Sequence, residues 1–498
     1  MKDLKQRTIR GGLAKIVAQA TTLLLRTGSL MIMARLLAPK DFGLVGMVTA
    51  VIGVFSIFRD FGLSAAAIQR ETITKEQSST LFWINLLVGA TLTLLTLATG
   101  PFVAAFYHEP RLSGVTAVLA TAFVVNAAGI QHFALLERQM RFVTLSIIDI
   151  SSLLVSTSVG IVLALRGFGY WSLVATAAIN PLVYTIGGWL ISGWVPGRPS
   201  RNTGILSMMR FGGTITLNSL VWYMAINFDR VLLGRFWGVE ALGIYGRAYQ
   251  LVSIPTDNLT GAAGGVVFAA LSRLQAQPDR LRSYFLKGYS MVLSLTVPIA
   301  FTCAIFGSDI IHIFLGAKWN SAVPIFRLLA PMTLGLATIT PLGWLLTSCG
   351  SVGRGLRMAL VITPVFIAGY SIGLLWGPKG VALGYSTAVI LSVVPLMAWA
   401  VHGTPVSLRD LLQTIGRPLL SGIVAAGIAL ALQILYGSLL PPLSRLIVGV
   451  VLISSVYLWM LVCIMKQGPF YLEIIRSFRS TPASDEQLVF SPSISGQA

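Results

Sequence analysis

The sequence is poor in charged residues for its length. Of 498 residues, 11% are charged, whereas a soluble domain carries about a quarter. Hydrophobic residues make up 55% of the chain, and the mean hydropathy is +0.80. A water-soluble protein would need many more polar side chains to cover this much apolar surface. The composition therefore excludes a soluble protein and indicates that most of the chain contacts lipid.

Cysteine and histidine are scarce as well. The three cysteines, Cys303, Cys349 and Cys463, lie far apart within apolar segments. They fit neither a disulfide framework nor a metal site. The four histidines show no ligand spacing, so we expect no metal and no other cofactor. A phosphate-binding loop of the type G-x-x-x-x-G-K followed by Ser or Thr is also missing, which argues against direct use of ATP.

The loops between the apolar segments are too short to hold a soluble catalytic domain. They show no Ser/His/Asp arrangement and no group of carboxylates and histidines that would suit catalysis. A membrane glycosyltransferase or polysaccharide polymerase would group charged residues on large external loops. We therefore predict that the chain is not an enzyme. Such a transferase or polymerase stays the alternative of another class, which sugar transfer in purified membranes would reveal.

Acidic residues are few, so the net charge is strongly positive: Lys and Arg number 36, Asp and Glu 17, and the formal charge is +19. The basic residues are spread over many short loops and form no tract, which excludes nucleic acid as a partner. More of them lie in loops on the side of the N-terminus, such as Arg138 and Arg273, than on the other side, such as Arg111. The positive-inside rule then places both termini in the cytoplasm.

A transmembrane helix needs about 20 mostly apolar residues, and the sequence predicts an all-α integral membrane protein with about fourteen such spans. The predicted spans are 12–36, 42–68, 81–106, 113–136, 143–165, 169–191, 209–233, 241–270, 285–306, 321–348, 357–377, 379–401, 417–437 and 443–465. Two pairs are separated only by short turns, Arg166–Gly169 and Gly377–Lys379. In each case the whole stretch is too long for one helix, and Gly or Pro allows a turn.

The chain contains an internal repeat. Residues 35–46, RLLAPKDFGLVG, resemble residues 235–246, RFWGVEALGIYG, with the Arg and the two later Gly residues in register. Each repeat holds six predicted spans, so both halves insert with the same orientation and are related by an axis along the membrane normal. The predicted units are 1–200 and 201–402, a helix pair at 403–466 and a largely disordered cytoplasmic tail at 467–498.

Charged and polar residues inside the spans mark candidate sites, because they are costly in lipid and usually face a cavity or a partner. Lys15, Gln19 and Arg26 share one face of the first span, although Lys15 could instead reach the head groups. The other candidate cavity residues are Arg59, Asn218, Arg230, Arg247, Gln250 and Arg327. The intramembrane carboxylates are Asp60, Asp149, Asp229 and Asp257.

The carboxylates have two interpretations. They could couple transport to an ion, or they could form structural ion pairs, for example Asp229 with Arg247. The intramembrane cations outnumber them by two. We therefore expect a cationic cavity that suits an anionic head group, since the planar guanidinium of arginine matches phosphate.

These segments resemble a known family. Residues 35–46, followed by Asp60-Phe61-Gly62-Leu63 and Ala67-Ile68-Gln69, resemble the opening of Wzx-type polysaccharide flippases, in the branch that handles colanic acid, succinoglycan and related exopolysaccharides. That family belongs to the multidrug/oligosaccharidyl-lipid/polysaccharide exporter superfamily. The resemblance extends over residues 1–466 and implies a fold like that of MATE transporters, with two six-helix bundles and an additional C-terminal pair.

The resemblance also implies a function. Such flippases move oligosaccharide repeat units linked to undecaprenyl pyrophosphate from the cytoplasmic to the periplasmic face, by alternating access through a central cavity. The implied partners are this lipid-linked oligosaccharide, the bilayer, the polysaccharide polymerase and the chain-length and export machinery. Two other transport functions remain open, a lipid II flippase and a MATE-type drug/cation antiporter. Loss of viability on deletion would favour lipid II, whereas loss of slime or capsule would favour an exopolysaccharide.

Overall fold

The structure is a computed structural model that describes residues 2–59, 74–199, 205–436, 439–465 and 467. Within these ranges all regular elements are helices. They are α1 (Lys2–Leu36), α2 (Pro39–Ile57), α4 (Lys75–Tyr107), α5 (Leu112–Arg138), α6 (Phe142–Leu165), α7 (Tyr170–Ser192), α8 (Ile205–Arg273), α9 (Pro278–Ile305), α10 (Gly307–Phe314), η1 (Ala317–Trp319), α11 (Ala322–Ser348), α12 (Val352–Gly373), η2 (Leu374–Trp376), α13 (Gly377–Val401), α14 (Leu408–Tyr436), α15 (Pro442–Trp459) and η4 (Met460–Ile464).

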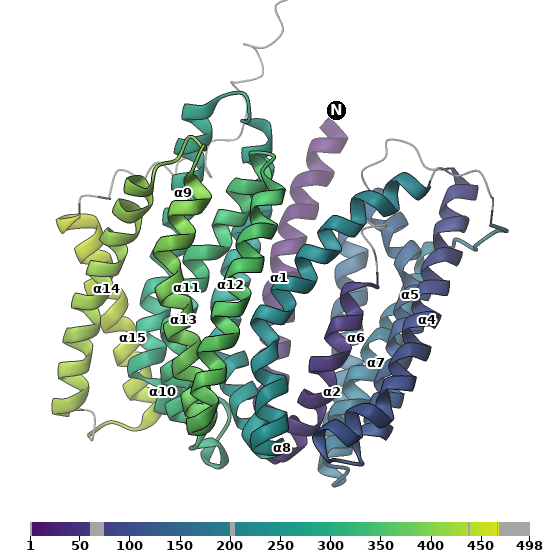
Figure 1. Cartoon of the computed structure of the whole chain (residues 1–498), viewed down its shortest axis with the longest axis horizontal. Coiled ribbons are helices and arrows are strands. Elements are labelled where there is room, and N and C mark those ends of the chain that lie inside the picture. The colour runs from purple at the N-terminus through teal and green to yellow at the C-terminus, as the bar shows by residue number, and fades with distance from the viewer. Residues whose placement is uncertain (1, 60–73, 200–204, 437–438, 466, 468–498) are drawn as a thin grey trace, which may run out of the picture.

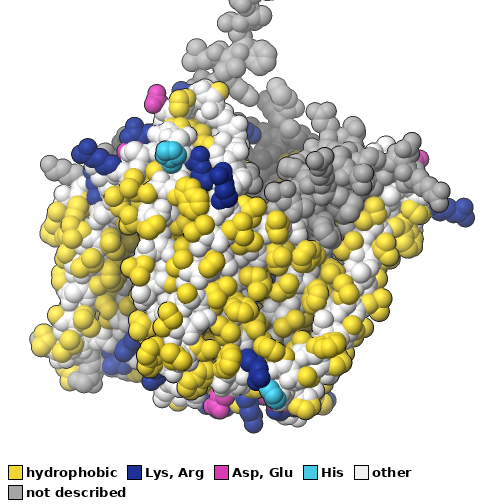
Figure 2. Space-filling model, viewed as in Figure 1, with side chains coloured by type: hydrophobic (Ala, Val, Ile, Leu, Met, Phe, Trp, Pro, Cys, Tyr) yellow, Lys and Arg dark blue, Asp and Glu magenta, His cyan; other side chains and the backbone are white. Residues whose placement is uncertain are grey.

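The helices form an integral membrane protein, as predicted. They run side by side, with α2 and α4–α7 on one side of Figure 1 and α9–α15 on the other. Hydrophobic side chains cover the middle of the surface in Figure 2, and Lys and Arg gather toward its two ends. Among the described residues, eleven helical segments are long and apolar enough to cross a membrane. The segment Gly353–Val401 counts once although it contains both α12 and α13, so the number fourteen stays a prediction.

Two sharp bends separate predicted pairs of spans. The first lies between α1 and α2, where Pro39 begins α2 and the backbone N–H of Ala38 donates to Asp41 Oδ2 at 3.0 Å. The second lies within α8 at Gly238, where the backbone φ is 81°. Glycine adopts this angle readily, whereas other residues would be strained there. Gly238 follows Ala38 by 200 residues, the offset of the sequence repeat. We call the end of the molecule that contains both bends the elbow end; in Figure 1 it lies opposite the N-terminus.

The two bends pack directly against each other. A Cβ atom on Gly43 of α2 would collide with the carbonyl group of Val239, and a Cβ atom on Gly243 of α8 would collide with the carbonyl group of Pro39. The two contacts are reciprocal, because each glycine of one repeat meets the residue that lies four positions before the other glycine. Glycine at these positions allows α2 and α8 to approach with backbone against backbone.

Arginines extend this reciprocal contact to the neighbouring helix corners. Arg35, at the end of α1, donates from Nη2 to the carbonyl oxygen of Ile313 in α10 at 2.8 Å, and Lys318 Nζ donates to the carbonyl oxygen of Arg35 at 3.1 Å. Its repeat equivalent Arg235 places Nη1 2.9 Å from Nδ1 of His108 at the corner between α4 and α5. Both halves of the chain therefore hold the elbow end together.

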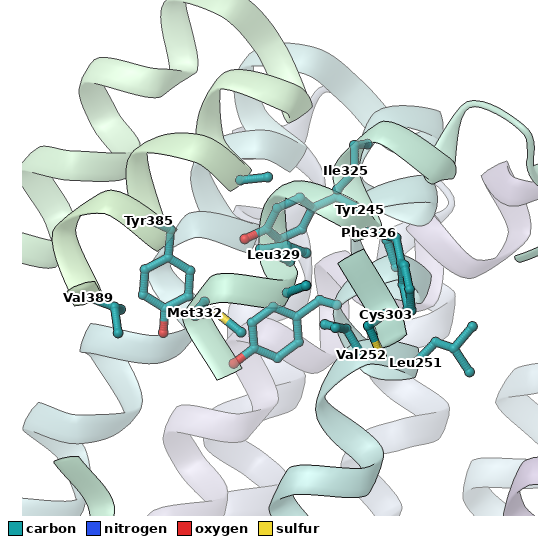
Figure 3. Close-up of a cluster of buried hydrophobic side chains, with 14 of the residues drawn as sticks. Tyr245, Leu251, Val252, Cys303, Ile325, Phe326, Leu329, Met332, Tyr385 and Val389 are labelled. Atoms are coloured by element: carbon teal, nitrogen blue, oxygen red, sulfur yellow. The ribbon is translucent and has the colours of Figure 1, made fainter. Parts of the chain in front are cut away.

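Tight packing also orders the second half of the chain. Figure 3 shows buried side chains from α8, α9, α11 and α13 meeting in one cluster. Its labelled members are Tyr245, Leu251, Val252, Cys303, Ile325, Phe326, Leu329, Met332, Tyr385 and Val389. Because lipid offers no hydrophobic driving force between helices, close contact of this kind is what holds such helices together.

One short helix was not expected from the sequence. The residues after 306 were predicted to form a loop, but Gly307–Phe314 form α10. Asp309 of this helix is buried, and both of its carboxylate oxygens lie 3.0 Å from Nε of Arg445 in α15. The ion pair spans 136 positions of the sequence, so no local pattern could predict it. It attaches the C-terminal helix pair to the rest of the molecule.

We expect Arg445→Leu to lower the free energy of unfolding by about 3 kcal/mol, because it leaves the Asp309 carboxylate buried without its partner. Thermal unfolding of the purified protein in detergent would measure the loss. The double variant Asp309→Asn/Arg445→Leu should recover most of it, since no charge then remains buried. Equal stability of the single variant and the native protein would show that this ion pair does not attach α15.

Candidate functional site

A polar cavity of 530 Å³ lies between helices from both halves of the chain. Residues of α1, α5, α6, α7 and α8 line it. The lining residues are Ala18, Gln19, Thr22, Leu23, Arg26, Thr27, Glu137, Phe142, Leu145, Ser146, Asp149, Tyr184, Gln250, Ile254 and Asn258. Side chains able to form hydrogen bonds make up more than half of this set. A cavity of this polarity inside a membrane protein is a candidate binding site.

The first helix contributes the polar face that its spacing predicted. Gln19, Thr22 and Arg26 all line the cavity, at steps of three and four residues along α1. The side chain of Arg26 is exposed, and it forms no ion pair with another described residue. The side chain of Lys15, predicted on the same face, lies outside the described residues. The described members of the predicted stripe therefore line one cavity, and their role in binding stays a prediction.

Two carboxylates share the cavity with Arg26. Asp149 of α6 accepts a hydrogen bond from Thr22 Oγ1 at 3.4 Å, which joins α6 to α1. Glu137 lies at the end of α5. The described lining thus contains one cation and two carboxylates. The sequence had led us to expect more cations than carboxylates. Several of the predicted cations lie elsewhere in the fold.

Arg230 and Arg247 of α8 are half-buried, on the same helix as the buried Asp229. Asp229 is fully buried and accepts hydrogen bonds from Tyr245 Oη at 2.5 Å and from the backbone N–H of Arg230 at 2.7 Å. The Arg230 guanidinium lies 4.8 Å from the ring centre of Tyr249, and that of Arg247 lies 4.6 Å from the ring centre of Phe42. Asp229 and Arg247 form no ion pair with each other in this structure, contrary to the suggested pairing.

The remaining predicted residues are scattered. Gln250 lines the cavity, but Asn218 is half-buried outside it. Arg327 donates to Ser308 Oγ at 3.3 Å beside α10. Asp257 lines a separate cavity of 410 Å³ between α8 and α11. Arg59 is exposed beyond the end of α2, and Asp60 lies outside the described residues.

Sequence reasoning missed some residues of the cavity. Glu137 stands beside Arg138 near the end of a span, where it looked like a loop residue. Tyr184 and Asn258 lie within predicted spans, and only the packing of their helices opposite α1 brings them to the cavity. A systematic search for every polar residue within the predicted spans would have found Asn258, but it could not have assigned it to this cavity.

The sequence profile of a family described as polysaccharide biosynthesis protein matches residues 32–324, more than half of the chain. This chain belongs to that family. The match covers α2, the cavity-lining part of α5–α8 and both bends of the elbow end.

Several curated proteins resemble this member of the polysaccharide biosynthesis protein family. The lipopolysaccharide biosynthesis protein WzxC of Escherichia coli is 27% identical over 79% of this chain and 80% of its own length. The teichuronic acid biosynthesis protein TuaB of Bacillus subtilis is 30% identical over 59% of this chain and 61% of its own length. The succinoglycan biosynthesis transport protein ExoT of Rhizobium meliloti is 23% identical over 68% of each chain.

Solved structures share the fold of this family member. A lipid II flippase, MurJ, in an inward closed conformation superposes with a TM-score of 0.74 at 13% identity, over 93% of this chain and all of the other. A MATE family multidrug resistance transporter of the MOP superfamily, in its inward-facing conformation, gives 0.63 at 14% identity, over 80% and 99% of the two chains. The fold is therefore that of the MATE and MurJ transporters, as the resemblance implied.

Proposed function

We propose that this chain is a flippase for polysaccharide biosynthesis, which moves an oligosaccharide repeat unit linked to undecaprenyl pyrophosphate across the bacterial inner membrane. The polar cavity between α1, α6 and α8 carries this proposal. Sugar hydroxyls and a pyrophosphate would lose their hydration in hydrocarbon, and a cavity with hydrogen-bonding walls removes most of that penalty. The relatives support it, since WzxC and ExoT are named for lipopolysaccharide biosynthesis and succinoglycan transport.

The transport step that we propose is alternating access between two halves, residues 1–200 and 201–402. The helix pair at 403–466 and a cytoplasmic tail at 467–498 complete the chain, and both termini face the cytoplasm. The cavity includes Ala18 of α1 and the corner between α5 and α6, on the side away from the elbow end. With this orientation the elbow end faces the periplasm, and the reciprocal contacts of Gly43 and Gly243 close the cavity there.

We assign a role to each of the main polar side chains of the cavity. Arg26 binds the pyrophosphate through its planar guanidinium, and Lys15 adds a second cation on the same helix face. Asp149 and Glu137 compensate the positive charges of Arg26 and Lys15 while the cavity is empty. Gln19 and Gln250 offer amide groups that can donate to and accept from sugar hydroxyls. The lipid tail stays in the bilayer, and the proposed partner on the periplasmic side is the polymerase that takes up the repeat unit.

Reconstitution into liposomes tests the function. We expect the purified protein to expose an undecaprenyl-pyrophosphate-linked oligosaccharide, loaded on one leaflet, to a sugar-binding probe on the opposite side. Protein-free liposomes should show no such transfer, and Arg26→Ala should show much less. Transfer of lipid II but not of the oligosaccharide lipid, export of an organic cation, or formation of new glycosidic bonds would each contradict the proposal.

A further inference from the structure

An apolar groove of 730 Å³ runs between α12 and α13. The two helices lie side by side in the second half of the chain (Figure 1). The groove shares no lining residue with the polar cavity between the halves. Apart from Lys379 and Thr387, its lining residues are apolar or glycine. A groove of this composition in a membrane protein suits a hydrocarbon chain better than a polar ligand.

Four glycines let the two helices meet backbone to backbone beneath this groove. A Cβ atom on Gly373 would collide with the carbonyl oxygen of Gly380, and a Cβ atom on Gly380 with that of Gly373. Gly369 and Gly384 form a second reciprocal pair of the same kind. All four glycines line the groove, so its floor is backbone and its depth comes from the missing side chains.

The groove is about as long as one leaflet of the membrane. On α13 its lining runs from Lys379 to Leu391, twelve residues further on, which is about 18 Å along the helix axis. Half of the hydrocarbon core measures about 15 Å. Ile372, Leu383 and Leu391 beside the glycines are 61%, 54% and 70% exposed. An acyl chain of a phospholipid matches this length and would cover these side chains, whereas an undecaprenyl chain is much longer.

One end of the groove lies at the elbow end of the molecule. Trp237, at the bend within α8, donates from Nε1 to the carbonyl oxygen of Leu374 at 2.9 Å, and Lys379 is the third residue of α13. Trp376 also lines the groove here and is 69% exposed. Tryptophan is enriched at the boundary between head groups and hydrocarbon. We therefore place this end of the groove, with Lys379, at the level of the lipid head groups.

Lys379 is the one charged residue in the lining, and its side chain is exposed. It forms no ion pair with any other residue that the structure describes. A cation at the head-group end of an apolar groove complements a lipid with an anionic head group. A second copy of the chain fits less well. A twofold axis along the membrane normal would bring Lys379 of both copies to the same depth, where the two like charges repel.

We propose that the groove between α12 and α13 holds an acyl chain of an anionic phospholipid, whose phosphate head group pairs with Lys379. The lipid belongs to the leaflet at the elbow end of the molecule. This site is separate from the polar cavity and does not depend on the proposed transport function.

Photolabelling of the purified full-length protein in liposomes tests this proposal. The probe is phosphatidylglycerol with a diazirine on one acyl chain, and the comparison probe is phosphatidylcholine with the same chain. We expect phosphatidylglycerol to label residues between Val365 and Leu391 in preference to phosphatidylcholine. Lys379→Gln should lower this labelling about fivefold, since a basic residue near the membrane surface contributes about 1 kcal/mol, and Lys379→Arg should retain it. The matched control Lys40→Gln removes an exposed lysine of α2 outside the groove and should leave the labelling unchanged.

A second variant tests the seat of the acyl chain. Ala368 is exposed within the groove, so Ala368→Phe fills the groove without displacing a buried side chain and should lower the labelling by both probes. Its matched control is Ala398→Phe, at an exposed alanine of α13 outside the lining, which should label as the native protein does.

Three results would overturn the proposal. They are equal labelling by the two phospholipids, equal effects of Lys379→Gln and Lys40→Gln, and equal effects of Ala368→Phe and Ala398→Phe. Stronger labelling of the groove by a photoreactive polyprenyl phosphate, or a dimer that Ala368→Phe dissociates, would also overturn it, because a different occupant would then fill the groove. None of these measurements involves transport, so their outcome is independent of the flippase assay.

Discussion

Arg26→Ala is expected to lower polysaccharide export at least about tenfold while leaving membrane insertion intact. Arg26 is the sole cation in the described lining of the central cavity, where Gln19 and Thr22 lie beside it on α1. A hydrogen bond between charged groups is worth about 1.5–3 kcal/mol, which corresponds to tenfold or more in affinity. Export would be measured as surface polysaccharide in a deletion strain that carries the variant, at matched protein levels.

Two further variants make this result specific. Arg26→Lys should retain part of the export, because it keeps the charge but loses the planar fork. Arg166→Ala removes an exposed arginine at the end of α6 that does not line the cavity, and it should export normally. Normal export by Arg26→Ala, with both controls behaving as described, would exclude a role for Arg26 in binding the anionic group.

Gly43→Val is expected to prevent accumulation of the folded protein. A side chain at this position would collide with the backbone of Val239, which cannot move without separating α2 from α8. Overpacking of a well-packed core costs about 1–3 kcal/mol and occasionally more, and a direct collision with backbone atoms should exceed that range. Gly243→Val should act in the same way through Pro39. Size-exclusion chromatography of a fluorescent fusion would measure the amount of folded protein.

Gly246→Val provides the matched control. It lies on α8 one turn beyond Gly243, and apart from the surrounding backbone of α8 no atom of the described residues lies within 4 Å of a Cβ placed there. This variant should accumulate to nearly normal levels, since it changes the same residue type in the same helix without a collision. Normal amounts of folded Gly43→Val protein would show that α2 and α8 can separate at the elbow end without loss of the fold.

The sequence marked Arg247 as a candidate cavity residue, and on that basis Arg247→Ala would also be expected to reduce export. The structure indicates a different physical reason for an effect of Arg247→Ala. The Arg247 guanidinium stacks on Phe42 of α2 and does not line the cavity. Loss of Arg247 would therefore weaken the contact between α2 and α8 and lower the amount of folded protein together with export, whereas Arg26→Ala should lower export alone.

Helical periodicity explains which parts of the site could be predicted. Gln19 and Arg26 share a face of α1 because residues three, four and seven apart lie together on any α-helix. The high cost of polar groups in lipid marked Gln250 as a cavity candidate and Asp149 as a carboxylate for ion coupling or ion pairing, and both side chains line the cavity. The rule places a residue on a face of its own helix. It does not say which neighbour that face meets.

The sequence by itself determined the membrane class, the helical content, the family resemblance and the breaks between the predicted spans 12–36 and 42–68 and between 209–233 and 241–270, because these depend on composition, local backbone chemistry and repeated motifs. Only the tertiary structure decided which intramembrane charges meet. Arg230 and Arg247 lie over aromatic rings, and Glu137 lines the cavity. Asp309 forms an ion pair with Arg445, which lies 136 positions further along the sequence. The physical reason is that the rotation of each helix about its axis follows from packing against its neighbours, which no single helix encodes.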